Sequence, residues 1–164
     1  MLMNNISLGN FNVGDNYPCY IIAEIGNLFK NFDEAKKLID SALSVGVNAI
    51  KFQTHIADAE SSIHEPFRVK FSKQDTTRYE YWHRMEFTLD QWRGLKTHCD
   101  EVGLEFISSP FSNAAVDLLE KVGVKRYKVG SGEVNNFVLL EKISYILQKK
   151  QNVIFFEYRI NFFK

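Results

Sequence analysis

Apolar and polar positions along the chain alternate in blocks, and these blocks predict strands that are each followed by a helix. Five short apolar runs are typical of buried strands, at 20–26, 47–54, 104–111, 126–132 and 152–156. Between them, four stretches carry apolar residues three or four positions apart, as amphipathic helices do, at 31–46, 87–103, 112–123 and 136–147. Residues 55–86 show only one helical pattern, over 76–85. A loop of this length is usually functional, so we expect a lid over one face of the fold.

Capping residues set the limits of the predicted helices. Asn31 or Asp33 can begin the first helix, because a short polar side chain accepts a hydrogen bond from a free backbone N–H group. Ser112 or Asn113 can begin the third helix in the same way. Glycines that can adopt the left-handed conformation follow the first three helices, at positions 46, 103 and 123.

The repeated strand–helix order predicts parallel strands joined by right-handed crossovers. Either an open doubly wound sheet or a (β/α)8 TIM barrel has this order. No G-x-G-x-x-G motif follows the first strand, so a dinucleotide-binding sheet has little support. A complete barrel needs about 200–250 residues. The 164 residues therefore predict an α/β fold that is a partial (β/α)8 TIM barrel, with about four βα units plus a fifth strand. We expect residues 1–164 to be the truncated N-terminal half of such a barrel.

Composition and charge narrow the class of protein. Hydrophobic residues make up 45% of the chain and charged residues 24%, the balance of a folded globular domain. Twenty Lys and Arg residues offset twenty Asp and Glu residues, so no charge excess favours nucleic acid or an anionic membrane as a partner. The sequence shows neither a secretory leader pattern nor an apolar run of about 20 residues. Its two cysteines are too few for a disulfide scaffold. We therefore expect a soluble, cytoplasmic protein.

Polar side chains interrupt each of the first four predicted strands near its C-terminal end, although strands covered on both faces are usually continuously apolar. They are Glu24, Lys51, Gln53, Ser108, Ser109, Lys128, Ser131 and Glu133. The C-terminal ends of parallel strands share one face of a sheet or barrel, where ligand sites lie. Two lysines, the serines and a Gly-Ser-Gly turn suit an anionic substrate that carries a carboxylate or a phosphate. The alternative is a set of ion pairs that close the barrel rim, such as Glu24 with Lys51 or Lys128.

Six segments in a fixed order carry a family resemblance: IIAEIG, AIKFQTHIADAES, EPFRVKFS, MEFTLDQW, FISSPFS and YKVGSGEVNN. Over about 20–140 the chain resembles the N-terminal half of the N-acetylneuraminate (sialic acid) synthase family, which includes the legionaminic and pseudaminic acid synthases. The resemblance implies a transferase of carbohydrate biosynthesis. Such an enzyme condenses phosphoenolpyruvate with an N-acetylated amino sugar and releases phosphate.

The resemblance also assigns roles to the polar residues. The positions that hold the carboxylate and phosphate of phosphoenolpyruvate match Lys51, Ser109, Lys128 and Ser131. A position near the acceptor sugar matches Gln53. The acidic positions proposed to bind hydroxyls or to handle protons, and so to be catalytic, match Glu24 and Glu133.

The chain departs from the family pattern in two places. The text IGNLFKNFDE after the first strand lacks the histidine of the family's Asn-His pair. After 133 the sequence contains no Gly, Pro or Ala and runs into NVIFFEYRINFFK. The family uses a divalent metal, Mn²⁺ or Mg²⁺, and we expect its two histidine ligands and the C-terminal antifreeze-like domain to be absent from this chain. On this interpretation the chain is a fragment that is inactive alone.

Two other functions stay open. A Schiff-base aldolase would use Lys51 or Lys128 as its amine nucleophile. A non-enzymatic half barrel would form a homo-oligomer or associate in another way through exposed strand edges. Within the lid segment, histidines 55, 64 and 83 match no compact metal-binding pattern and are interpreted as surface or loop-packing residues. The run RYEYWHRMEF is interpreted as a half-buried loop helix.

Overall fold

Five parallel strands form the centre of the molecule, in the order β3-β4-β5-β6-β7 across the sheet. The computed structural model describes residues 5–27, 29–150 and 153–156. The strands are β3 (Ile22–Gly26), β4 (Ala49–Thr54), β5 (Glu105–Pro110), β6 (Arg126–Val129) and β7 (Val153–Phe156). Each strand pairs with the next one along the chain, as strands in a barrel do, whereas the order of a doubly wound sheet reverses.

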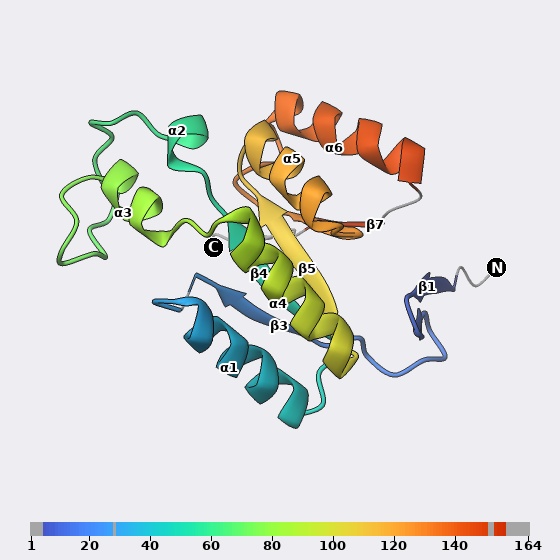
Figure 1. Ribbon diagram of the computed structural model, residues 1–164. Helices are drawn as coiled ribbons and strands as arrows, with labels where there is room; N and C mark the ends of the chain where they lie inside the picture. Colours follow the sequence, from blue (N-terminus) through green and yellow to red (C-terminus); the bar gives the residue numbers. More distant parts are fainter. Residues whose placement is uncertain (1–4, 28, 151–152, 157–164) are drawn as a thin grey trace, which may run out of the picture.

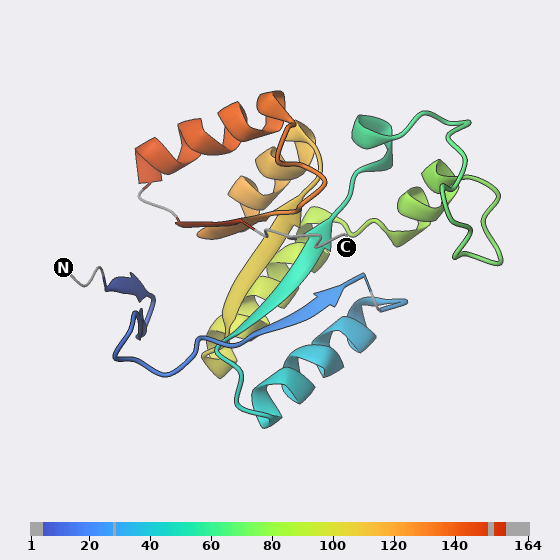
Figure 2. The same ribbon diagram turned by 180° about the vertical axis from the view of Figure 1, so that it is seen from behind.

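Four helices alternate with these strands: α1 (Phe32–Ser44), α4 (Leu89–Val102), α5 (Asn113–Val122) and α6 (Phe137–Lys150). In Figure 1, α1, α4 and α5 lie in front of the sheet, and in Figure 2 they lie behind it. The helices pack side by side in chain order, α1 against α4, α4 against α5 and α5 against α6. One layer of helices on one face of a sequentially ordered parallel sheet is the arrangement of a (β/α)8 barrel, so the predicted partial barrel is confirmed.

The predicted elements agree with the structure, with small shifts at their ends. Asn31 caps α1 by accepting a hydrogen bond from the Glu34 backbone N–H at 2.9 Å, and Ser112 caps α5. Strand β6 ends at Val129 rather than at 132, because the Gly-Ser-Gly segment forms a turn. Helix α6 continues to Lys150 instead of ending at 147. Position 152 and the apolar segment 157–164, on which the prediction of a truncated chain partly depended, lie outside the described residues.

The lid segment contains two helices. Helix α2 (Ala57–Glu60) is a single turn that the sequence did not predict, and α3 (Arg78–Met85) matches the predicted helical pattern. Thr77 and Glu80 form a capping box at the start of α3, in which each side chain binds the other residue's backbone N–H group. This box fixes where the lid changes from irregular chain to helix.

An N-terminal hairpin that the sequence did not predict precedes the barrel. Its strands, β1 (Ile6–Leu8) and β2 (Phe11–Val13), have three residues each, too few to show an alternating pattern. Gly9 in its turn has φ +62°, and a Cβ atom there would lie 3.1 Å from the Glu105 carboxylate. Glu105 forms an ion pair with Arg126 at 2.5 Å, so the hairpin turn covers a polar pair at the N-terminal ends of β5 and β6.

The main hydrophobic core lies between the sheet and the helices. Alternate residues of β4, β5 and β6 point into it, among them Ile50, Phe52, Phe106, Tyr127 and Val129. The helices supply the opposing side chains, which include Ile39, Trp92, Leu95, Cys99, Leu119 and Ile143. The other strand face carries Glu24, Lys51, Gln53, Ser109 and Lys128, so core and candidate site use opposite faces of the same strands.

The two cysteines should differ sharply in reactivity. Cys99 is fully buried, and burial raises the pKa of its thiol to about 12, whereas Cys19 is exposed. Because the thiolate is the reactive form, a disulfide reagent at pH 8 should modify one thiol rapidly in the folded chain and two after unfolding. Cys19→Ser should abolish the rapid phase. Two rapidly reacting thiols in the folded protein would contradict this core.

Candidate functional site

Glu24 and Lys51 form an ion pair between the middle of β3 and the middle of β4. The Lys51 Nζ lies 2.5 Å from Glu24 Oε2, and the two residues are direct neighbours in the strand register. The Lys51 side chain is 3% exposed and the Glu24 side chain is 53% exposed. Glu24 also accepts a hydrogen bond from the Gly26 backbone N–H at 3.0 Å, across a register shift in β3. The carboxylate is therefore held from two sides while one edge faces solvent.

Strand alternation separates the two adjacent serines of β5. Ser109 is the register partner of Gln53 and shares a face with it and with Lys51. Ser108 is the partner of Phe52 and points to the helix side, where its hydroxyl hydrogen-bonds the Thr54 hydroxyl at 2.8 Å. The Ser109 hydroxyl is buried and has no hydrogen-bond partner within the described residues. Ser109 is therefore the serine available to a ligand.

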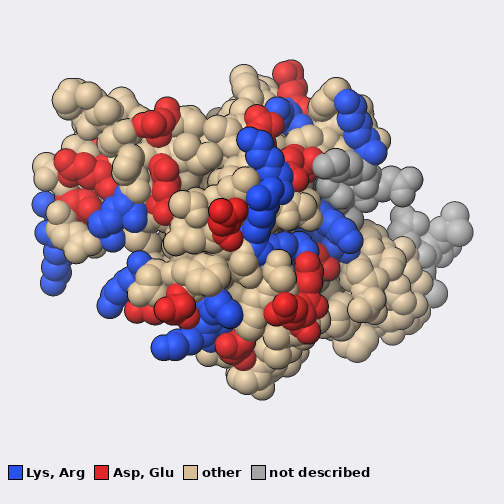
Figure 3. All heavy atoms as spheres, viewed as in Figure 1, with Lys and Arg blue, Asp and Glu red and all other residues tan. Residues whose placement is uncertain are grey.

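One cavity of about 450 Å³ gathers four of the predicted site residues: Glu24, Lys51, Gln53 and Lys128. We call it the lysine cavity. The remaining walls come from the end of β3 and the residue after it, and from Tyr81 and Trp82 of the lid helix α3. Two ammonium groups and one carboxylate give the cavity a local excess of positive charge. On the face of the molecule shown in Figure 3, basic and acidic side chains are interspersed.

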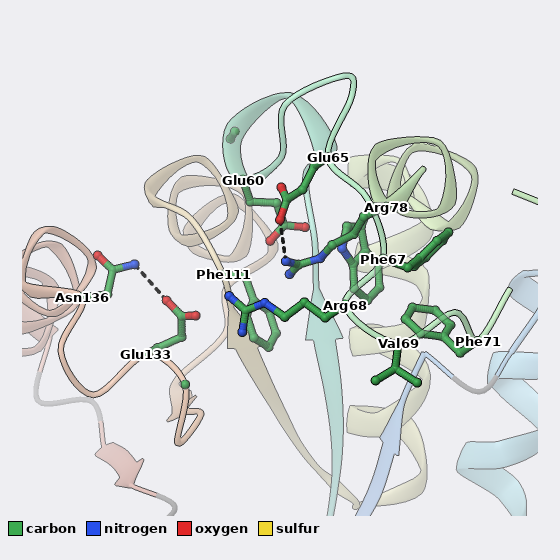
Figure 4. Close-up of a pocket in the computed structure, with 13 residues that line it drawn as sticks. Glu60, Glu65, Phe67, Arg68, Val69, Phe71, Arg78, Phe111, Glu133 and Asn136 are labelled. Carbon is green, nitrogen blue, oxygen red and sulfur yellow. Dashed lines mark hydrogen bonds and ion pairs between the residues drawn. The ribbon is translucent and has the colours of Figure 1, made fainter. Parts of the chain in front are cut away.

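Glu133 lies in a neighbouring and larger cavity of about 790 Å³, the lid cavity. Figure 4 shows Glu133 on the loop before α6, hydrogen-bonded by the Asn136 amide at 2.8 Å. On the opposite wall, Arg78 donates to Glu65 at 2.9 Å, and Arg68 extends from the lid loop toward the Glu133 side. Further wall residues include Glu60, Phe67, Phe71, Trp82 and Phe111. The structure thus places the two predicted acidic residues in adjacent cavities rather than in one.

Two predicted site residues, Ser109 and Ser131, are absent from the wall residues of both cavities. Ser109 is buried in β5, whereas Ser131 is exposed in the turn between β6 and α6. Its neighbours Gly132 and Glu133 do line the lid cavity. The turn therefore borders the site, but the hydroxyl of Ser131 lies outside it.

The lid supplies wall residues that sequence reasoning did not assign to the site: Arg68, Arg78, Tyr81 and Trp82. Three of them, Arg78, Tyr81 and Trp82, belong to the basic and aromatic run interpreted as a half-buried loop helix, whereas Arg68 lies outside it. The lid has its own polar brace, because Arg84 donates two hydrogen bonds to Asp75, at 3.0 and 2.7 Å. These bonds hold the pKa of Asp75 below its usual range. Ser72 also donates to this carboxylate, at 2.5 Å.

The described residues contain no group of three or more His, Cys, Asp or Glu side chains that could hold a metal ion. They do not by themselves fit the Mn²⁺ or Mg²⁺ that the resemblance implies. Over the same described part of the chain, no helix is long and apolar enough to cross a membrane.

Comparisons with known proteins show which proteins the chain resembles. The chain is 38% identical to the human N-acetylneuraminate-9-phosphate synthase over 134 residues, which are 79% of this chain and 37% of that protein. It is 32% identical to the N,N'-diacetyllegionaminic acid synthase of Campylobacter jejuni, over 79% of this chain and 40% of that protein. The chain therefore spans about two fifths of these relatives.

A solved structure gives the same relationship. The N-acetylneuraminic acid synthetase of Leptospira borgpetersenii, solved with citrate, superposes with a TM-score of 0.74 at 26% identity. The match covers 94% of this chain and 49% of that one. The model of the NeuB family matches residues 38–155, which include β4, β5, β6 and the lid. Because this match covers most of the chain and the fold agrees with it, the chain belongs to the NeuB family.

Proposed function

We propose that this chain provides the phosphoenolpyruvate-binding half of a synthase that joins phosphoenolpyruvate to an N-acetylated amino sugar and releases phosphate. The observation that carries the proposal is the lysine cavity, where Lys51 and Lys128 approach the same space beside Glu24. The relatives, named as synthases of N-acetylneuraminate 9-phosphate and of diacetyllegionaminic acid, support a product of the sugar-acid class. The catalytic activity belongs to the whole family protein, and we expect this chain alone to bind without turnover.

Charge and hydrogen bonding suit the lysine cavity to phosphoenolpyruvate. The substrate has a carboxylate and a phosphate on adjacent positions of a three-carbon unit, so two cations on β4 and β6, which line the same cavity, can engage both groups. Charge-assisted hydrogen bonds from ammonium groups are stronger than neutral ones, and strand positions keep them in fixed geometry. The buried Ser109 hydroxyl can add a neutral donor on the same strand face.

We assign the acceptor sugar to the lid cavity and to the part of the lysine cavity beside Gln53. A space of about 790 Å³ lies within the range of pockets that hold small ligands. Its walls combine aromatic rings with carboxylates and guanidinium groups, which suit the faces and the hydroxyls of a sugar. Trp82 lines both cavities, so the two substrates would meet beside it.

In the proposed reaction, the methylene carbon of phosphoenolpyruvate forms a bond to the aldehyde carbon of the open-chain sugar. The aldehyde oxygen takes up a proton, and water adds to the cationic carbon that bears the phosphate, giving up a proton. The carbon–oxygen bond to phosphate then breaks, phosphate leaves, and a keto acid remains. Glu24 and Glu133 are the groups on either side that could donate or accept these protons.

The assignment of phosphoenolpyruvate to the lysine cavity predicts that substitutions of two lysines change its affinity unequally. Lys51→Met keeps the length of the side chain but removes its charge, so affinity for phosphoenolpyruvate should fall about 10- to 100-fold. Lys125→Met is the matched control, because Lys125 is exposed just before β6, at the opposite end of the barrel. Isothermal titration calorimetry measures both, with thermal melting to verify folding. An equal loss in the two variants, or no loss in either, would refute the assignment.

Substitutions of the two serines of β5 should differ in their effects on ligand affinity and on stability. Ser109→Ala should weaken phosphoenolpyruvate binding about fivefold with little change in stability, because its hydroxyl has no partner within the described residues. Ser108→Ala should do the reverse: it removes the hydrogen bond with Thr54, at a cost of about 1 kcal/mol in the free energy of unfolding. Calorimetric titration and urea denaturation of both variants separate these effects. If Ser108→Ala is the variant that weakens binding, the ligand lies on the other strand face.

We also propose that the chain associates through the outer edges of its sheet. Strands β3 and β7 stand at its two ends, and each pairs with only one other strand among those described. Open edges favour pairing with a further chain. Sedimentation velocity should therefore show a species larger than 19.0 kDa that dissociates on dilution. A monomer at all concentrations would exclude this association.

A further inference from the structure

His55 occupies the middle of a stack of three rings. Its imidazole lies 3.5 Å from the ring of Trp82 on one side and 4.2 Å from the ring of Phe111 on the other, measured between centroids. The interplanar angles are 11° and 12°, so the three rings are nearly parallel. His55 directly follows β4, Phe111 directly follows β5, and Trp82 belongs to α3. The stack therefore joins two strand ends to the lid.

A buried carboxylate orients the imidazole. His55 Nδ1 and Glu60 Oε1 lie 2.8 Å apart, and their side chains are only 5% and 6% exposed. Glu60 ends the single turn of α2, which leaves the barrel immediately after His55. One hydrogen bond thus fixes the rotation of the ring, and the stacked neighbours fix its plane.

The position of Trp82 depends on this stack. Its indole N–H is buried without a hydrogen-bond partner among the described residues, so no hydrogen bond of this group fixes the ring. Beyond His55, its ring partner is Tyr81, at 4.7 Å in an edge-to-face arrangement, and Tyr81 belongs to the same helix. Trp82 lines both the lysine cavity and the lid cavity. His55 lines neither.

We propose that His55 is a positioning residue that holds Trp82 as the wall between the two cavities. Through Trp82 it sets where α3 rests over the strand ends and how the lid cavity is shaped for the acceptor. The assignment of substrates to the cavities rests on the proposed function, but the control of Trp82 by His55 does not. Phosphoenolpyruvate contacts come from strand residues, so loss of His55 should affect acceptor binding far more than phosphoenolpyruvate binding.

The experiment labels both tryptophans of the full chain with 5-fluorotryptophan and follows their two ¹⁹F resonances, assigned with Trp92→Phe. The solvent isotope shift between H₂O and D₂O reports the exposure of each indole. In His55→Ala we expect Trp82 to become exposed and Trp92 to stay unchanged, because Trp92 lies in the hydrophobic core. His55→Phe should restore most of the protection, since it keeps a flat ring in the stack. His64→Ala, an exposed histidine of the same loop, is the matched control.

Calorimetric titrations of the same variants use phosphoenolpyruvate and N-acetylmannosamine as probes. His55→Ala should weaken binding of the sugar about tenfold and leave phosphoenolpyruvate within about threefold. An unchanged Trp82 isotope shift in His55→Ala, or equal weakening of both ligands, would overturn the proposal. If the unmodified chain binds neither ligand, the proposed function fails, and the fluorine data alone still decide whether His55 holds Trp82. If His55→Ala does not melt cooperatively, the fluorine measurement is made on Glu60→Ala, which removes the carboxylate that orients the imidazole.

Discussion

The ion pair between Lys51 and Glu24 is the interaction on which the site depends. An ammonium group that is almost fully buried is costly unless a charged partner compensates for its lost hydration. Glu24 supplies that partner from the neighbouring strand, at a register position that backbone hydrogen bonding fixes. Its carboxylate remains half exposed, so the pair opens to the cavity instead of closing the rim completely. Both readings of these residues from the sequence, a rim ion pair and a ligand site, are therefore compatible in one arrangement.

The second organising feature is the long segment between β4 and α4. In the other units of the fold, a strand passes to its helix through a short connection, but here two small helices intervene and fold back over the strand ends. The Asp75–Arg84 pair braces this lid internally, and the stack around His55 attaches it to the barrel. One indole consequently divides the space above the strands into two compartments of different chemistry. One is cationic, and the other is aromatic with mixed charges.

Much of the fold could be predicted because its signals are local. Buried strands, helical periodicity, Asn31 and Ser112 as caps, and glycine stops each depend on residues close together in the sequence. The elements that the sequence did not predict, or predicted with wrong ends, lack such local signals. The hairpin has strands too short to show a period, and α2 has only four residues. The strand predicted over 126–132 included the Gly-Ser-Gly turn at 130–132, because the apolar pattern does not show at which residue strand pairing ends.

The candidate site could likewise be predicted only where its signals are local. By itself, the sequence determined which polar residues stand at strand ends, and parity indicated that Lys51 and Gln53 share a face. Only the tertiary structure decided that Ser109 and not Ser108 shares their face, that Glu133 lies in a separate cavity, and that neither Ser109 nor Ser131 lines the lysine cavity or the lid cavity. It also brought Trp82 between the two spaces from nearly thirty residues beyond β4. Periodicity records what each residue does within its own element, whereas a cavity forms where distant elements meet, and that meeting is set by packing of the whole core.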